Sequence, residues 1–288
     1  MGQLWLPAVL AFLFGLAVGS FLNVVIHRVP EGESIVRPRS RCPGCRVPIA
    51  AWDNIPLLSY LLLRGRCRRC GIRIPARYPL IELSMGLLFA ALVLRTGLHP
   101  LLPVWMAFSA ALVAAAVIDF DHQYVPDAIS VGGSVVALAV VPLARLAAGH
   151  APLDALLQSV TGAALGSGML WIVGFGHARF SAAMGRSFPH WPGEGESLPE
   201  PDSLDYWTWF PGLGFGDVKL MALIGACLGP VGVVSTIALA ALVGLVWGGV
   251  AALLRGTARM PFGFGPSLAL AAIATLLLPS SIFRIFLP

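Results

Sequence analysis

The sequence predicts an all-α polytopic membrane protein, and three observations support this fold class. Of its 288 residues, 57% are hydrophobic and only 11% are charged, which is more apolar sequence than one soluble core can bury. Apolar runs of membrane-spanning length recur along the chain. Basic residues gather in the loops that would share one side of the membrane. Each span must be helical, because only a helix satisfies every backbone polar group within one segment.

We expect about eight transmembrane helices, of which the second and the sixth are short. The first follows no basic residue, has no small-residue cleavage signal after it and leads directly into His27 and Arg28. It therefore reads as a retained anchor and not as a removed signal peptide. The expected spans cover residues 4–26, 80–94, 101–118, 128–146, 155–175, 218–228, 231–254 and 266–286.

The basic residues set the expected orientation. Eleven of the nineteen Lys and Arg lie between Arg28 and Arg77, and eight spans place five more on the same side against three on the other. By the positive-inside rule, the loop that holds these eleven is cytoplasmic and both termini face outward. The net charge of +5 reflects this topology, so we expect a lipid bilayer as partner and no nucleic acid.

Two stretches interrupt the apolar pattern. Residues 27–79 are basic and carry four of the five cysteines, whereas residues 177–211 are rich in Gly, Pro and acids and have too few periodic apolar residues for a core. We expect three parts: a first transmembrane helix (1–26), a cytoplasmic four-cysteine domain (27–79) and a membrane-embedded domain (80–288). The last contains a cytoplasmic insertion at about 177–211, extended or partly ordered.

The four cysteines form two CxxC pairs. CPGC (Cys42, Cys45) is followed after 21 residues by CRRC (Cys67, Cys70), a spacing typical of a structural zinc site. Disulfides are disfavoured in the reducing cytoplasm, and a redox CxxC would not need two copies. A closed four-thiolate site organises its loop and catalyses no hydrolysis. Its negative charge would be offset by the flanking Arg41, Arg46, Arg66, Arg68 and Arg69.

Two carboxylates fall at expected cytoplasmic ends of spans. Asp119, in VIDFDHQYVPD, closes the third span, and Asp217, in GLGFGDVKL, opens the sixth after Gly214 and Gly216. Intramembrane acids are functional candidates because their desolvation is costly. Two carboxylates in one cleft would share a proton, as the pair of an aspartic protease does.

Other roles fit some of these acids. Asp217 could stabilise the positive end of its helix dipole, Asp127 after Pro126 suits the N-cap of the fourth span, and Asp121 suits a solvated or supporting role. An Asp pair in a membrane protein also fits a proton or cation site of a transporter. The residues alone leave these alternatives open.

Four motifs together resemble the type IV prepilin peptidases, a family of membrane aspartic proteases of the GxGD kind. They are GSFLNVVIHRVP from Gly19, the stretch RCPGC to IELSMG from Arg41, IDFDHQYVPD from Ile118 and GFGDVKL from Gly214. The resemblance covers nearly the whole chain apart from the insertion. It implies a bacterial inner-membrane enzyme with its active site on the cytoplasmic side.

The resemblance also implies an activity and site residues. Members cut the basic leader from prepilins and pseudopilins, then methylate the new N-terminus with S-adenosylmethionine. The catalytic pair falls on Asp119 and Asp217, with Gly214, Gly216, Lys219 and Asp127 as supporting residues; the zinc ligands fall on Cys42, Cys45, Cys67 and Cys70. No residue is assigned to the methyl donor.

Two alternative functions remain open, and the insertion suggests a role of its own. The chain could be a GxGD protease of other membrane helices, or a transporter or assembly factor with unreactive acids. The insertion is longer than the linker typical of the family, and its acids could attract a basic leader. These acids are Glu194, Glu196, Glu200, Asp202 and Asp205.

Overall fold

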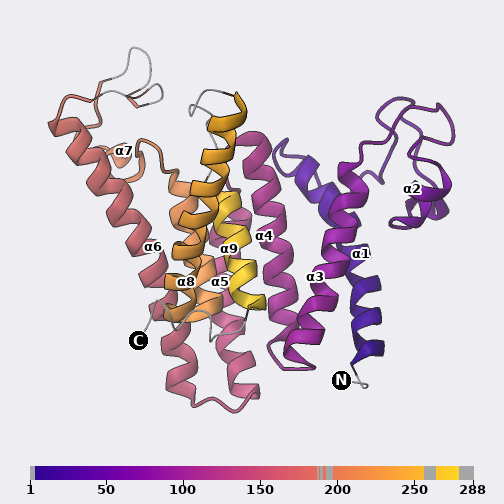
Figure 1. The fold of residues 1–288 in the computed structure, drawn as a ribbon, viewed down its shortest axis with the longest axis horizontal. Coiled ribbons are helices and arrows are strands. Elements are labelled where there is room, and N and C mark those ends of the chain that lie inside the picture. The colour runs from indigo at the N-terminus through magenta and orange to yellow at the C-terminus, as the bar shows by residue number, and fades with distance from the viewer. Residues whose placement is uncertain (1–3, 187, 189–190, 193–196, 256–263, 279–288) are drawn as a thin grey trace. The chain divides into compact units, whose positions relative to one another are not determined.

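A computed structural model describes residues 4–186, 188, 191–192, 197–255 and 264–278 (Figure 1). Within these residues the secondary structure is helical. The β-structure there is limited to isolated bridges, and no strand is formed. Six helices in this described part of the chain are long and apolar enough to cross a membrane. They are α1 (Trp5–Arg28), α3 (Arg77–Thr96), α4 (Leu102–His122), α5 (Asp127–Ala147), α6 (Pro152–Ala183) and α8 (Phe215–Arg255). The all-α membrane class is confirmed, and the chain is a multi-pass membrane protein.

The expected number of eight spans is not confirmed, and the difference lies in α8 and α9. Residue Gly229 breaks α8 with a φ of 74°, and Pro230 follows. A β-carbon on Gly166 would lie 2.6 Å from Met221 O and 3.2 Å from Val233 Cγ2. In a straight helix Met221 and Val233 would be about 18 Å apart, so α8 folds back at Gly229.

The two arms of α8 correspond to the expected sixth and seventh spans. The first arm, residues 215–228, reaches only about 20 Å at 1.5 Å per residue, which is less than the hydrocarbon thickness of a bilayer. The helix α9 (Gly265–Leu277) has 13 residues and matches the start of the expected eighth span. The remainder of that span lies outside the described residues.

The chain divides into two compact units, Met1–Ala114 and Ala115–Pro288. In the first unit, α1 packs on α3 through a GxxxG pair. A β-carbon on Gly15 would lie 2.5 Å from Met85 O, and one on Gly19 would lie 2.6 Å from Glu82 Cα. Such close backbone contact requires glycine, and it is typical of helix pairs in membranes.

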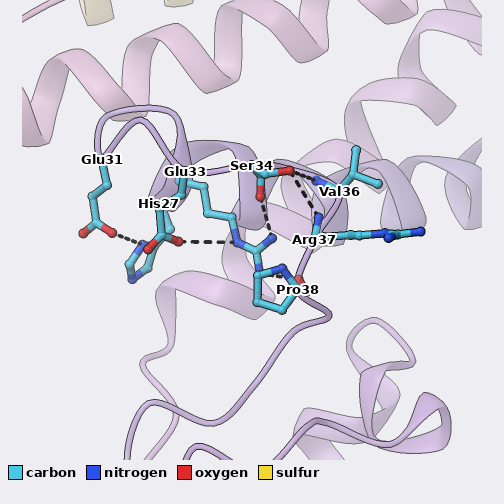
Figure 2. A network of polar contacts seen from close by, with 8 residues as sticks. His27, Glu31, Glu33, Ser34, Val36, Arg37 and Pro38 are labelled. Atoms are coloured by element: carbon cyan, nitrogen blue, oxygen red, sulfur yellow. Dashed lines mark hydrogen bonds and ion pairs between the residues drawn. The ribbon is translucent and has the colours of Figure 1, made fainter.

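The loop after α1 is tied back to the end of that helix. The guanidinium of Arg28 donates to the carbonyls of Ser34 and Pro38, each at 2.8 Å. Figure 2 shows the Ser34 hydroxyl accepting from the backbone amides of Val36 and Arg37, and His27 beside Glu31. These contacts fix the start of the cysteine-rich loop. The loop also contains η1 (Ala51–Asn54) and α2 (Leu58–Leu62).

In the second unit, α6 packs on α8 through a second GxxxG pair, Gly162 and Gly166. The insertion folds partly against α6, which continues to Ala183, and it contains the short α7 (Leu204–Thr208). The Arg179 guanidinium of α6 lies 3.8 Å from the centre of the Tyr206 ring. The acids Glu200, Asp202 and Asp205 are exposed; Glu194 and Glu196 lie outside the described residues.

Candidate functional site

Both candidate catalytic acids belong to the second unit and are buried. Asp119 lies in the last turn of α4, and Asp217 lies in the first turn of α8. Each is only 5% exposed. Each acid therefore lies at the end of a membrane-spanning helix: α4 ends shortly after Asp119, and α8 begins just before Asp217.

The two carboxylates face one point beside Gly265, the first residue of α9. A β-carbon there would lie 2.6 Å from Asp119 Oδ2 and 3.4 Å from Asp217 Oδ1. Asp119 Oδ2 has no hydrogen-bond partner among the residues that the structure describes. The predicted approach of the two acids, 98 positions apart in the sequence, is therefore present in this structure.

This arrangement suits hydrolysis with water as the nucleophile. Two buried carboxylates that reach the same small space can hold one water molecule between them, one as proton acceptor and one as proton donor. Gly265 lets the start of α9 lie against the dyad, because any side chain there would meet Asp119 Oδ2. The dyad thus has the parts that an aspartic protease needs.

The role of Gly265 was missed in the sequence interpretation, although a local signal is present. A Gly-Pro pair, Gly265 and Pro266, opens α9, and proline is favoured in the first turn of a helix. That signal predicts where the helix begins. It does not predict that the first residue of α9 contacts acids on α4 and α8.

The glycines before Asp217 have different surroundings. A β-carbon on Gly216 would lie 3.3 Å from Val125 Cβ, so Gly216 lets the segment before α5 approach the start of α8. Gly214 has more room, and its carbonyl accepts a hydrogen bond of 3.0 Å from the Asp217 amide. Both residues shape the turn that presents Asp217.

Lys219 and Asp127 form an ion pair beside the dyad, with Nζ 2.7 Å from Oδ1. The expectation that Asp127 caps α5 is wrong. The N-cap residue is Pro126, and no side chain makes a capping hydrogen bond there. Asp127 is the first helical residue. Asp121, the other acid of this segment, is exposed.

The four cysteines of the first unit form a single cluster. Their sulfur atoms lie within 4.8 Å of one another, and Cys42 Sγ is 3.7 Å from Cys70 Sγ. Four thiolates at 2.3 Å from a central zinc ion would be about 3.8 Å apart. The cluster therefore fits one tetrahedral metal ion, as the spacing of the two CxxC pairs predicted.

Two similar turns present these cysteines. An isolated bridge closes each turn, Arg41 with Pro48 and Arg66 with Arg73. In the first turn the Arg46 amide donates to Cys42 O, and in the second the Gly71 amide donates to Cys67 O. Backbone hydrogen bonds from Cys70 and Arg69 lower the pKa of Cys67 to about 6, whereas burial and hydrogen bonds with the neighbouring thiols raise the pKa of Cys70 to about 11. The thiols of the cluster therefore ionise one after another.

The chain matches two family models. Residues 13–96 match the bacterial peptidase A24 N-terminal domain. Residues 106–249 match the type IV leader peptidase family. The first match contains the four cysteines, and the second contains both buried aspartates.

Curated relatives with the printed name prepilin leader peptidase/N-methyltransferase match much of the chain. One from Aeromonas salmonicida is 36% identical, over 99% of this chain and 96% of its own. One from Neisseria gonorrhoeae is 35% identical, over 90% and 86%. One from Myxococcus xanthus is 49% identical, but only over 55% of this chain and 45% of its own. No solved structure matches. By its family model and its relatives, the chain belongs to the type IV leader peptidase family.

Proposed function

We propose that this protein is a membrane aspartic peptidase that removes the basic leader from type IV prepilins and pseudopilins, with Asp119 and Asp217 as its catalytic residues. The observation that carries the proposal is the approach of both carboxylates to one point at Gly265. The names of the relatives supply the substrate class. The proposed place of cleavage is the cytoplasmic face of the inner membrane, in keeping with the distribution of basic residues.

In the proposed reaction, one carboxyl group of the pair is protonated and the other is ionised, because two carboxylates in one site disfavour double ionisation. The ionised group accepts a proton from water, and the water oxygen attacks the scissile carbonyl carbon. The protonated group gives its proton to the carbonyl oxygen, which forms a tetrahedral diol. Collapse of the diol breaks the C–N bond, and a carboxyl group protonates the leaving amine.

Conservative substitutions of the two acids test this role. Asp119→Asn and Asp217→Asn preserve shape but cannot accept the proton, so each should abolish cleavage of a purified prepilin by the protein in detergent or nanodiscs. Each variant should keep the thermal unfolding midpoint of the parent within a few degrees. Cleavage retained by either variant would mean that the substituted acid is not catalytic. An intact prepilin with the parent protein would favour a protease of other membrane helices, a transporter or an assembly factor.

We infer that the ion held by Cys42, Cys45, Cys67 and Cys70 is zinc, because tetrahedral four-thiolate sites are typical of structural zinc. With all four positions occupied by protein ligands, the ion would stabilise the loop and supply no catalysis. The exposed arginines of this loop would offset its negative charge.

We further infer that the protein methylates the new N-terminus with S-adenosylmethionine, as the names of the relatives suggest. A cavity of about 390 Å³ between α5, α6 and α8 offers few unpaired hydrogen-bond donors to this methyl donor. The hydroxyls of Ser134 and Ser167 in its lining already bond helix carbonyls, and its one cation, Lys219, is paired with Asp127. Mass spectrometry of a prepilin after co-expression would report the cleavage site and an added methyl group together.

A further inference from the structure

A short segment of the cysteine-rich loop, residues 52–62, exposes an unusual amount of apolar surface. The exposed fractions are 69% for Trp52, 45% for Ile55, 49% for Leu58, 70% for Leu61 and 72% for Leu62. Exposed apolar groups scattered singly are common, but five large ones within eleven residues mark a contact surface. We call residues 52–62 the apolar segment.

A hydrogen bond fixes the apolar segment beside a membrane-spanning helix. The Leu57 amide donates to Glu82 Oε2 at 2.8 Å. Glu82 lies on α3, about 7 Å along the helix from its first residue, Arg77. It also contacts Gly19, more than two turns before α1 ends at Arg28. The segment therefore lies level with the first turns of α3 and not beyond its end, as Figure 1 shows for α2.

Several backbone amides of the apolar segment are paired within the loop, which favours contact with lipid. The Ile55 amide donates to the Ser59 hydroxyl, and the amides of Ser59 and Leu61 donate to Ile55 O and Leu57 O. The three amides that follow the segment also donate to carbonyls within it: Leu63 N to Ser59 O, Arg64 N to Leu61 O and Gly65 N to Tyr60 O. The segment can thus present its side chains to lipid without leaving these amides unpaired.

Hydrogen bonds connect the same segment to the cysteine cluster. The Ser59 hydroxyl donates to Trp52 O at 2.9 Å, which closes η1 onto α2. Asp53, next to Trp52, receives a hydrogen bond of 2.7 Å from Arg68 Nη2, within the CRRC turn. Any surface that holds the apolar segment would therefore also orient the cluster.

Positive charge follows the apolar segment directly. Arg64, Arg66, Arg69 and Arg73 are exposed. Apolar side chains next to arginines are the pattern of an element that lies in the membrane interface, with the apolar groups below the headgroups and the cations near phosphates.

We propose that the apolar segment is an interfacial anchor that inserts Trp52, Leu61 and Leu62 into the bilayer and docks the cysteine-rich loop on an anionic lipid surface. The partner is the bilayer itself, and the segment lies in its interface without crossing it. The anchor would hold the folded cysteine-rich loop at a fixed height beside the first unit's spans.

Photolabelling of the full chain in nanodiscs tests the proposal. The discs contain phosphatidylethanolamine and phosphatidylglycerol, with a diazirine on the acyl chain of a trace phospholipid, and peptide mass spectrometry reports the labelled residues. We expect lipid adducts within residues 52–62 at yields comparable to those of α1 and α3. Val36, which is 77% exposed in the same loop, should carry few.

Paired substitutions give the matched control. Leu61→Gln with Leu62→Gln should lower the adduct yield of residues 52–62 at least fivefold while the yields of α1 and α3 stay unchanged, and Val36→Gln should change none of them. Absence of adducts in residues 52–62 while the spans are labelled would overturn the proposal. So would photo-crosslinks from a diazirine amino acid at position 61 that join protein and not lipid, because the segment would then be a protein-docking surface.

Discussion

Lys219 lies 2.7 Å from Asp127, and this ion pair joins two segments that are 92 residues apart. Asp127 begins α5 shortly after the segment that carries Asp119, and Lys219 follows Asp217 by two residues. A cation near the start of a helix opposes the helix dipole, and Asp127 compensates for it. The pair therefore ties together the two chain segments that carry the dyad.

Breaking this pair should impair catalysis more than stability. The Asp127 side chain is 66% exposed, and such pairs contribute about 0–1 kcal/mol to folding. Misplacing a catalytic group by about 1 Å can slow a reaction about 100-fold. We expect Lys219→Met to lower kcat for prepilin cleavage about 10- to 100-fold with little change in KM.

The charge swap separates positioning from a direct role of the amine. Lys219→Asp combined with Asp127→Lys restores an ion pair between the same segments and should recover part of the lost kcat. A kcat that is unchanged in Lys219→Met, or a swap no better than the single variants, would contradict the positioning role.

Gly265 should not tolerate even one methyl group. A β-carbon there would lie 2.6 Å from Asp119 Oδ2, so Gly265→Ala must displace a carboxylate of the proposed catalytic pair. We expect kcat to fall at least 100-fold with little loss of stability, because the atom that must move is the end of the Asp119 side chain. The matched control is Gly176→Ala on α6, where a β-carbon meets nothing within 4 Å; it should cleave prepilin at the parent rate. Full activity of Gly265→Ala would mean that the substrate-competent site differs from the one described.

The dyad and the cysteine cluster could be predicted because their signals are local. Two CxxC turns identify four metal ligands by spacing alone, and the structure brings their sulfur atoms within 4.8 Å. Asp119 and Asp217 were found because acids at the ends of apolar runs are rare, and the family resemblance gave them a common role. The helical class followed from the continuity of the apolar runs.

The features that the sequence did not predict depend on contacts between distant segments. The expected short sixth span, residues 218–228, agrees with the first arm of α8, but the packing of Met221 and Val233 against Gly166 was not predicted. Gly265 meets Asp119 only because α9 packs on α8. The Leu57 to Glu82 hydrogen bond likewise joins a loop to a span 25 residues away. Nothing in the periodicity of either partner indicates such pairs.

Where α6 and α8 cross, a larger side chain should lower the stability of the second unit more than elsewhere in that unit. A β-carbon on Gly162 would overlap Gly225 O, and one on Gly225 would overlap Gly162 O. Gly162→Leu must separate the two helices, and we expect a loss of about 1–3 kcal/mol or more. Thermal unfolding in detergent measures it. Gly168→Leu, on the same helix with nothing within 4 Å of its β-carbon, should stay near the parent midpoint. Equal midpoints for the two variants would contradict this packing.

Metal removal should unfold the cysteine-rich loop and leave the second unit folded. The four cysteines lie on short turns closed by isolated bridges, and such turns depend on the ion that joins them. We expect elemental mass spectrometry to find one zinc ion per purified parent chain. The Cys67→Ser variant should lose this zinc ion and should be cleaved rapidly by a protease between Cys42 and Cys70. Cys227→Ser should keep the zinc, because Cys227 is buried in α8 and belongs to the other unit. A parent protein that contains no zinc and still resists proteolysis in this loop would show that hydrogen bonds alone, such as those of Arg28 and Asp53, hold it together.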